Sequence, residues 1–186
     1  IVNSIHDIYT VFYDYKRNSQ YVKLITPVEF DSLNKTPKIS YNLCKTYIDF
    51  TKTNLSLDPY LLGLWLGDGH MNRPVITNTD DEVIEYLKEY AKDNNVGISF
   101  YTKKGCRAKN ISFKKGSGGI NKFKNDITEL NLWGNKSIPD IYLKNSRENR
   151  LKLLAGIIDT DGHYDKKYER IEIIQVRENL AKQICF

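Results

Sequence analysis

The residues with the clearest capacity for chemistry are two aspartates, Asp68 and Asp161, which occupy the same place in two copies of one motif. Residues 61–70 read LLGLWLGDGH and residues 154–163 read LAGIIDTDGH, so five of the ten positions are identical. Apolar residues precede each aspartate and a glycine follows it. We expect a helix that ends at each Asp-Gly pair, with the glycine adopting a left-handed turn.

The two helices are expected to pack closely against each other. In the first copy, Gly63 and Gly67 are four residues apart and therefore lie on one helical face. The corresponding pair in the second copy is Gly156 and Thr160. Small residues at this spacing allow two helix backbones to approach, so the motif predicts a two-helix interface with both aspartates at one end.

Two aspartates in this arrangement are unfavourable unless a cation binds between them. A carboxylate at a helix C-terminus opposes the helix dipole by roughly 0.3–1 kcal/mol when exposed, and two neighbouring carboxylates repel each other. A divalent cation would remove both penalties, and Mg²⁺ prefers hard oxygen ligands. Asp68 and Asp161 are therefore predicted to hold Mg²⁺, or Mn²⁺ in its place.

The motif also resembles a known family signature. LAGIIDTDG differs at two positions from LAGLIDADG, and LLGLWLGDG is similar to a common form of the first copy. Over roughly residues 55–186, the chain resembles a LAGLIDADG homing endonuclease of the kind found in inteins. The resemblance implies an α+β fold of two αββαββα repeats with pseudo-two-fold symmetry, of which the second is truncated here.

The same resemblance implies a function and further site residues. The expected activity is metal-dependent hydrolysis of both strands of double-stranded DNA, with Asp68 and Asp161 catalytic and the carbonyls of Gly69 and Gly162 as further metal ligands. In intein endonucleases a lysine precedes an extended Ile-Pro dipeptide, and the matching run GNKSIPDI nominates Lys136 as the group that polarises the attacking water or neutralises the charge developing on the phosphate. The alternative is that Lys136 is a solvated loop lysine.

The first aspartate of the signature is kept in only one copy. Asp159 retains it, whereas Leu66 replaces it in the first copy. In the family this position is usually structural, so we assign it no catalytic role.

A basic stretch predicts an anionic partner. The chain has a net charge of +5, but residues 101–124 contain eight Lys/Arg and no Asp or Glu, which leaves −3 for the remainder. A two-stranded ribbon fits the major groove of DNA, where cations contact phosphates and base edges. The predicted DNA-binding residues are Lys103, Lys104, Arg107, Lys109, Lys114 and Lys115.

The sequence divides into three segments. Residues 1–54 are β-rich, with a hairpin followed by an irregular segment, and are interpreted as the tail of an intein splicing domain or a DNA-recognition region. Residues 55–145 would form the first repeat and residues 146–186 the start of the second. Expected helices cover 59–68, 79–95, 118–134, 146–162 and 177–186, expected strands 74–79, 98–104, 109–115 and 168–176, and residues 136–143 are expected to be extended.

Composition excludes several other classes. The hydrophobic content of 40% suits a globular protein, and no run approaches the roughly 18 apolar residues of a membrane span. The N-terminus shows no secretory signal. Three cysteines without metal-type spacing favour free thiols in an intracellular setting, wherever the target DNA lies.

Four further expectations concern activity and context. The alternative to an active endonuclease is a DNA-binding remnant that has lost cleavage, or an RNA maturase. If the chain is part of an intein, host protein sequences flank it. The ends resemble those of a fragment, and we expect no self-splicing, because the chain neither begins with Cys or Ser nor ends in His-Asn.

Overall fold

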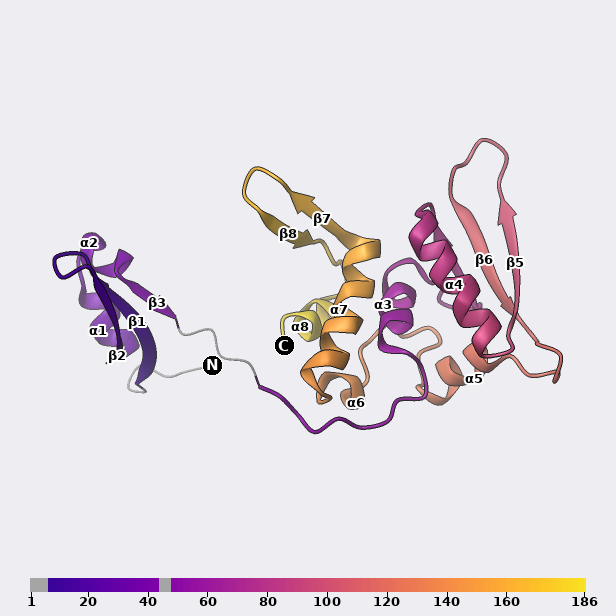
Figure 1. The fold of residues 1–186 in the computed structure, drawn as a ribbon, viewed down its shortest axis with the longest axis horizontal. Coiled ribbons are helices and arrows are strands. Elements are labelled where there is room, and N and C mark those ends of the chain that lie inside the picture. Colours follow the sequence, from indigo (N-terminus) through magenta and orange to yellow (C-terminus); the bar gives the residue numbers. More distant parts are fainter. Residues whose placement is uncertain (1–6, 44–47) are drawn as a thin grey trace. The chain divides into compact units, whose positions relative to one another are not determined.

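The computed structural model describes residues 7–43 and 48–186, and the chain divides into two compact units, Ile1–Ile48 and Asp49–Phe186. This division lies six residues before the boundary expected after residue 54. Parts of the predicted N-terminal segment, residues 1–6 and 44–47, lie outside the described residues. Helices and antiparallel sheets make the structure α+β (Figure 1).

The first unit is a small sheet with two short helices. Strands β1 (Ile8–Asp14) and β2 (Ser19–Ile25) form the predicted hairpin, and β3 (Tyr41–Leu43) pairs with the other edge of β1. The prediction that an irregular segment follows the hairpin is wrong, because helices α1 (Pro27–Ser32) and α2 (Lys35–Ile39) lie there. The start of α1 is fixed by a capping box in which Thr26 and Glu29 exchange hydrogen bonds.

The second unit begins with the motif helix α3 (Pro59–Asp68), followed by β4 (Val75–Asn78), α4 (Asp81–Asp93), β5 (Gly97–Thr102), β6 (Lys109–Lys114) and α5 (Lys122–Glu129). These strands form an antiparallel sheet in the order β4-β6-β5. Gly69, immediately after α3, makes an isolated bridge with Ile76 of β4.

The second motif starts a similar order of elements. After the short helix α6 (Asp140–Leu143) come α7 (Arg147–Asp161), β7 (Gly162–Asp165), β8 (Arg170–Ile173) and α8 (Glu178–Ile184). Two expectations were wrong here: α6 lies within the stretch expected to be extended, and β7 was not predicted. Strand β7 pairs with β8 as a two-stranded sheet.

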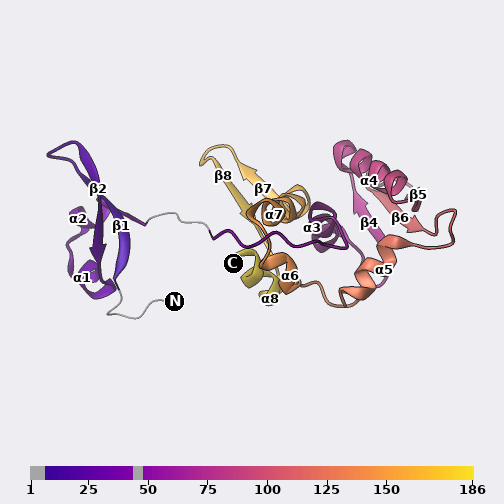
Figure 2. The ribbon, with the colours of Figure 1, turned by 60° about the horizontal axis from the view of Figure 1, so that its bottom comes forward.

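The core of the second unit surrounds α3 and one face of its three-stranded sheet. Ile76, Ile111 and Phe113 are buried on this face. Helices α4 and α5 cover it, since the ring of Phe113 contacts Tyr90 of α4 and Phe123 of α5 at centroid distances of 6.1 and 4.3 Å. Helix α3 lies between α7 and the sheet with its covering helices α4 and α5 in both views (Figures 1 and 2). No helix among the described residues is long and apolar enough to span a membrane.

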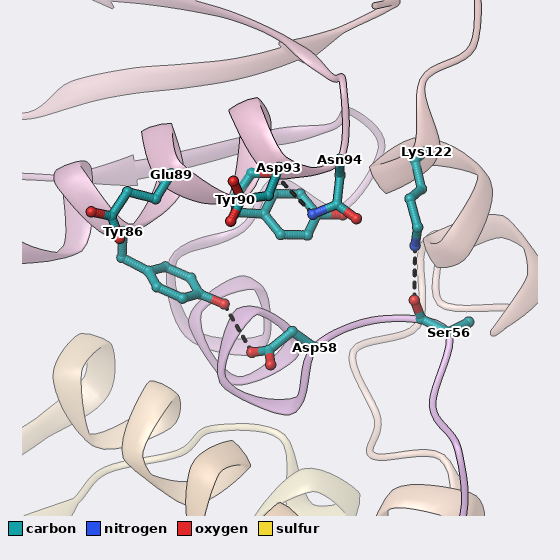
Figure 3. A pocket seen from close by; sticks show the side chains of 8 residues that line it. All are labelled: Ser56, Asp58, Tyr86, Glu89, Tyr90, Asp93, Asn94 and Lys122. Carbon is teal, nitrogen blue, oxygen red and sulfur yellow. Dashed lines mark hydrogen bonds between the residues drawn. The ribbon is translucent and has the colours of Figure 1, made fainter.

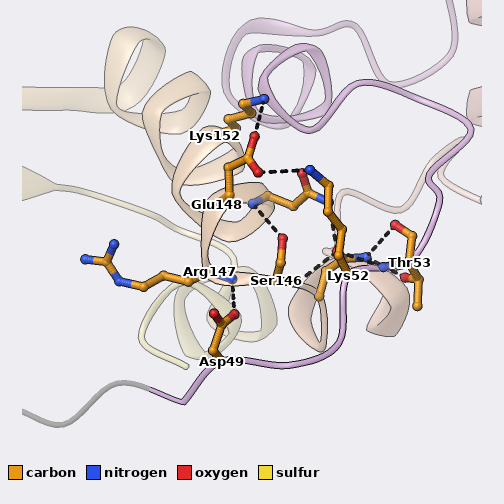
Figure 4. A network of polar contacts seen from close by, with 9 residues as sticks. Asp49, Lys52, Thr53, Ser146, Arg147, Glu148 and Lys152 are labelled. Atoms are coloured by element: carbon orange, nitrogen blue, oxygen red, sulfur yellow. Dashed lines mark hydrogen bonds and ion pairs between the residues drawn. The ribbon is translucent and has the colours of Figure 1, made fainter.

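The extended segment before α3 is tied to the start of α7 by polar contacts (Figure 4). Asp49 accepts a hydrogen bond of 2.7 Å from the Arg147 backbone N–H, and Lys52 lies 2.9 Å from Glu148. Lys152 also contacts Glu148, and the hydrogen bonds from the two lysines lower the pKa of Glu148 to about 2. The chain entering the first motif helix is therefore anchored on the second motif helix.

Candidate functional site

The two motif helices meet through their small residues. A Cβ atom added at Gly63 would overlap the carbonyl oxygen of Leu153, and one added at Gly156 would overlap that of Tyr60. At the next turn, a Cβ at Gly67 would overlap the side chain of Thr160. The four small residues singled out by spacing thus lie where α3 and α7 approach most closely.

The glycines that follow the aspartates do not adopt the left-handed turn expected from the sequence. Gly69 has φ −74° and ψ 148°, and Gly162 has φ −85° and ψ 148°, so both are extended. The physical reason for glycine is steric, because a Cβ would overlap the carbonyl oxygen of Trp65 or Ile158 one turn earlier. The chain therefore leaves each helix directly into an extended segment.

Asp68 and Asp161 occupy the last helical position of α3 and α7. Burial raises the pKa of Asp68, and the nearby Asp161 carboxylate raises it further, while a hydrogen bond from Asn78 acts in the opposite direction. The two carboxylates are thus close enough to repel each other. Their arrangement matches the pair predicted from the sequence pattern.

Each aspartate is contacted by a side-chain amide that the sequence analysis did not identify. Asn78 donates to Asp68 at 2.8 Å, and Gln175 lies 3.5 Å from Asp161 in the same role. The amide oxygens accept backbone N–H groups, from Asp80 for Asn78 and from Arg177 for Gln175, which fixes the NH₂ group toward the carboxylate.

The strand pairing shows that these amides are structurally equivalent. Gly69 pairs with Ile76, and Gly162 pairs with Ile173. Asn78 lies two residues after Ile76, and Gln175 two residues after Ile173. A polar amide at the end of the strand after each motif was a signal in the sequence, but the longer β7–β8 hairpin hides it by changing its spacing from the aspartate.

Lys136 is buried beside the aspartates and is not a solvated loop residue. Its side chain belongs to a residue only 6% exposed, and its Nζ donates to the carbonyl oxygen of Gly67 at 2.7 Å. Burial, reinforced by the charge of Arg177, lowers the pKa of Lys136 to about 8, while Asp161 and Asp68 partly oppose this. The site thus combines two carboxylates with one buried amine.

Arg177 is a second cation at the site that the sequence analysis missed. It precedes α8 at the N-cap position without capping it, and its guanidinium lies 3.4 Å from the sulfur of Met71. The equivalent residue in the first repeat, by the same strand pairing, is Asp80, which caps α4 through the N–H of Glu82. A cation at a helix N-terminus opposes the dipole, so helix stability does not explain Arg177.

The remaining motif aspartate has a structural contact. Asp159 accepts a hydrogen bond of 2.7 Å from the hydroxyl of Tyr60 across the helix pair. Leu66, its counterpart in the first copy, is buried in the core. Both observations agree with leaving this position out of the catalytic set.

The basic residues predicted to bind DNA lie on and around the β5–β6 hairpin but do not all face the same way. Lys103, Lys104 and Arg107 are exposed in the connecting loop. Lys114 is exposed at the end of β6, and Lys115 is exposed just beyond it. Lys109 points differently: it shares the helix-covered face with Ile111 and Phe113, and its Nζ lies 3.2 Å from Asp81 of α4.

The opposite face of the sheet is polar. Strand pairing places Ser99, Tyr101, Asn110 and Ser112 together on this face, directed away from the core. His70 joins them through Thr77, whose hydroxyl lies 2.9 Å from His70 Nε2 and donates to Asn110 at 2.7 Å.

This polar face presents neutral hydrogen-bond donors and acceptors in addition to cationic side chains. Burial, with the charges of Arg73 and Lys136, lowers the pKa of His70, so its imidazole is mainly neutral near pH 7. The result is a set of hydrogen-bonding groups flanked by the lysines of the hairpin.

The donor set suits a hard divalent cation. Two carboxylates from facing helix ends, with backbone carbonyls adjacent, are the oxygen ligands that Mg²⁺ prefers. In residues 7–43 and 48–186 there is no group of three His, Cys, Asp or Glu side chains arranged to hold a metal. Further ligands at this site would therefore be backbone carbonyls, water or substrate.

Comparison with known proteins finds similarity to parts of larger chains. The chain is 30% identical over 148 residues to the homothallic switching endonuclease of Saccharomyces cerevisiae, which covers 63% of this chain and 23% of that protein. It is 28% identical over 153 residues to the replicative DNA helicase DnaB of Mycobacterium intracellulare, covering 80% and 22%. It is also 33% identical over 126 residues to the probable translation initiation factor IF-2 of Methanocaldococcus jannaschii, covering 66% and 10%.

The chain thus spans less than a quarter of the length of each of these relatives. No family model matches it. The similarity to an endonuclease makes a DNA-cleaving nuclease the function to test.

Proposed function

We propose that the chain is the endonuclease region of a LAGLIDADG homing endonuclease, which binds a specific site in double-stranded DNA and hydrolyses a phosphodiester bond in each strand. The observation that carries the proposal is the pairing of Asp68 and Asp161 at the ends of two glycine-packed helices, with Lys136 buried beside them. Similarity to a switching endonuclease supports the same activity.

The metal would be held by Asp68 and Asp161, with the carbonyls of Gly69 and Gly162 as further ligands. A bound Mg²⁺ or Mn²⁺ supplies the charge that stabilises the attacking and leaving oxygens of phosphodiester hydrolysis. Asn78 and Gln175 orient the carboxylates, because each directs its NH₂ group at one of them.

Lys136 is suited to neutralise the charge that develops on the phosphate. It is held in place by its hydrogen bond to the Gly67 carbonyl, and the neighbouring Asp161 and Asp68 carboxylates favour its charged form by raising its pKa against the effect of burial. Preorganised cations of this kind stabilise a transition state at little reorganisation cost. Arg177, on the second repeat, offers a second cation beside it.

The polar face of the β4-β6-β5 sheet is the proposed DNA surface. Its hydrogen-bonding residues suit base edges, and Lys103, Lys104, Arg107, Lys114 and Lys115 suit phosphates. Lys109 is less suited to bind a phosphate, because its charge is paired with Asp81 on the helix-covered face of the sheet.

An intein origin is supported by the pattern of similarity. The three relatives are named as a helicase, an initiation factor and an endonuclease, and one shared segment cannot be the source of three such different activities. A transferable insertion accounts for its presence in all three. In this proposal, host protein sequences flank the chain and the first unit belongs to, or adjoins, the splicing domain.

The second candidate is a protein that binds nucleic acid without cutting it, either a DNA-binding remnant or an RNA maturase. The observation that favours it is the polar face of the β4-β6-β5 sheet with the lysines beside it, which can bind nucleic acid whether or not the aspartates cleave it.

The test is cleavage of a randomised double-stranded DNA library in Mg²⁺, with sequencing of the cut ends. Asp68→Asn and Asp161→Asn are the test variants, and Asp159→Asn is the matched control, since Asp159 lies in the same motif but contacts Tyr60. Sequence-specific ends that disappear in the two test variants and persist in the control would establish the endonuclease.

Other outcomes separate the alternatives. Retention of specific DNA from the library without cut ends would identify a remnant, and preferential binding of structured RNA would indicate a maturase. Chelation of divalent cations should abolish cleavage and leave the chain folded, with at most a lower thermal unfolding temperature because a cation that binds the folded state stabilises it. Cleavage that survives chelation would contradict the metal assignment.

A further inference from the structure

The polar face of the β4-β6-β5 sheet contains one row of side chains that hydrogen bonds link from strand to strand. Strand pairing places Thr77 of β4, Asn110 of β6 and Tyr101 of β5 in line across the sheet. The Thr77 hydroxyl oxygen lies 2.9 Å from His70 Nε2 and 2.7 Å from Oδ1 of Asn110. The row thus connects His70, two residues after the first motif aspartate, to the central strand of the sheet.

The direction of these hydrogen bonds follows from the number of hydrogens available. A threonine hydroxyl has one hydrogen, and Thr77 donates it to the oxygen of Asn110. In the contact with His70, Thr77 must therefore be the acceptor and Nε2–H the donor. The relay runs from His70 through Thr77 to Asn110, and it holds the amide oxygen of Asn110 toward β4.

The NH₂ group of Asn110 is left without a partner. The residue is half-buried, and within the part of the chain that the structure describes its amide nitrogen makes no hydrogen bond. By contrast, the Tyr86 hydroxyl in the pocket at the start of α3 already donates to Asp58 (Figure 3). Asn110 therefore offers two N–H donors to a molecule bound on the polar face, while its oxygen is held by Thr77.

We propose that Asn110 reads guanine in the major groove of the bound DNA. The inference rests on the proposed function, since it takes the polar face as the DNA surface. Asparagine usually reads adenine, because its oxygen accepts from N6 while its NH₂ group donates to N7. Here Thr77 engages the oxygen, and guanine presents two acceptors, N7 and O6, without a donor in the major groove. The relay therefore changes which purine the asparagine prefers.

The second repeat cannot form the same relay. Counted from the equivalent strand pairings after each motif, Ile174 stands where the first repeat has Thr77. Isoleucine has no hydroxyl that could accept one hydrogen bond and donate another. The guanine preference is therefore expected in one half of the DNA site and not at the related position of the other half.

Selection from a randomised double-stranded DNA library tests the proposal, with all variants made in the Asp161→Asn chain so that retained DNA is not cut. Asn110→Ala should remove the preference at one base pair, which identifies the position that Asn110 reads, and the preferred base there should be guanine. Thr77→Val frees the amide oxygen and should lower the ratio of guanine to adenine at that position at least about fivefold. Ser112→Ala is the matched control, on the same strand and face but outside the row, and should leave this position unchanged.

The relay is also tested without DNA. An NMR correlation between the ring nitrogens and protons of the histidines, at mildly alkaline pH, should place the single ring proton of His70 on Nε2. A proton on Nδ1 would mean that the relay runs in reverse and would overturn the proposal, as would a preference for any other base at the Asn110 position. Failure to retain any specific DNA, with the proton on Nε2, would overturn the proposed function and this inference with it.

Discussion

The first and second repeats carry the same motif but surround its aspartate differently. Asp68 is half-buried and receives a 2.8 Å hydrogen bond from the buried Asn78. Asp161 faces the half-exposed Gln175 at 3.5 Å. The lysine of the site comes from the first repeat and its arginine from the second. The motif therefore determines where the carboxylates lie, and the flanking elements determine how tightly each is held.

The two repeats also differ in how completely their sheets are covered. In the first, α4 and α5 bury one face of three strands. In the second, Tyr164 and Ile171 of the two-stranded sheet are 55% and 53% exposed. The first repeat thus supplies most of the core, and the α3–α7 contact is the most extensive of the contacts that join the second repeat to it.

The largest expected effect comes from breaking that contact. Gly63→Val or Gly156→Val would place methyl groups against backbone of the partner helix, which cannot move as a flexible side chain would. We expect a loss of more than about 3 kcal/mol in the free energy of unfolding, measured by urea denaturation. Gly118→Val is the control, because a Cβ there meets open space. A small effect at Gly63 would mean that the helices do not pack as described.

The next largest effect is expected at alkaline pH, where the buried tyrosines of the first repeat should lower the free energy of unfolding and the exposed tyrosines of the second should not. Burial raises the pKa of Tyr60, Tyr86, Tyr90 and Tyr142 above the usual 10, to about 12 for Tyr142. A group whose folded pKa is raised contributes stability that is present below pH 10 and is lost as pH rises toward its folded pKa. Each well-buried tyrosine therefore costs up to about 1.4 kcal/mol per pH unit above pH 10.

The measurement is the free energy of unfolding between about pH 9 and pH 11. All four tyrosines belong to the first repeat or its flank, whereas Tyr164 and Tyr168 of the second are exposed. Tyr90→Phe should flatten the decline, and Tyr168→Phe should leave it unchanged. If the free energy of unfolding fell as steeply in Tyr90→Phe as in the parent, the decline would not come from the buried Tyr90 hydroxyl.

The amide pair gives the third comparison. Asn78→Ala should cost about 1–3 kcal/mol, because it removes a buried group that bridges Asp68 and the start of α4. Gln175→Ala should cost less, since its contact is longer and half-exposed. In the nuclease proposal, each variant should slow cleavage, with Asn78→Ala the more severe. Equal effects on unfolding would show that the two aspartates are held alike.

Much of the fold could be predicted because its signals are local. The expected helices 59–68, 79–95 and 146–162 are confirmed as α3, α4 and α7, and each of them begins at a side-chain cap, Asp58, Asp80 or Ser146. Strand β7 could not be predicted, since GHYD has little apolar alternation and becomes a strand only by pairing with β8. The Asp-Gly ends misled for a related reason: the following bridge to a strand requires extended backbone, which the helix sequence does not encode.

The site was predictable to a similar degree. Repetition alone singles out the aspartates and the small residues of the interface. The burial of Lys136 was not visible in GNKSIPDI, because it arises when the loop after α5 folds against the end of α3. The pairing of Lys109 with Asp81 was also not visible, because a run of basic residues does not show which side chain will face a helix and form an ion pair.

The smallest effect concerns Asp80 and Arg177, which occupy equivalent positions before α4 and α8. Asp80→Ala removes a cap and should cost about 1 kcal/mol of stability. Arg177→Ser should do the reverse and add up to about 1 kcal/mol, because serine can cap α8 and the unfavourable cation is removed.

If Arg177 is retained for a phosphate contact, Arg177→Ser should also lower the dependence of DNA affinity on salt by about one unit in log–log slope. Arg177→Lys should keep most of that slope, since it preserves the charge. A variant that gains stability and leaves the slope intact would show that the arginine serves neither helix nor DNA. Gained stability with a reduced slope would mean that the second repeat has exchanged a helix cap for a contact with substrate, which the first repeat has not done.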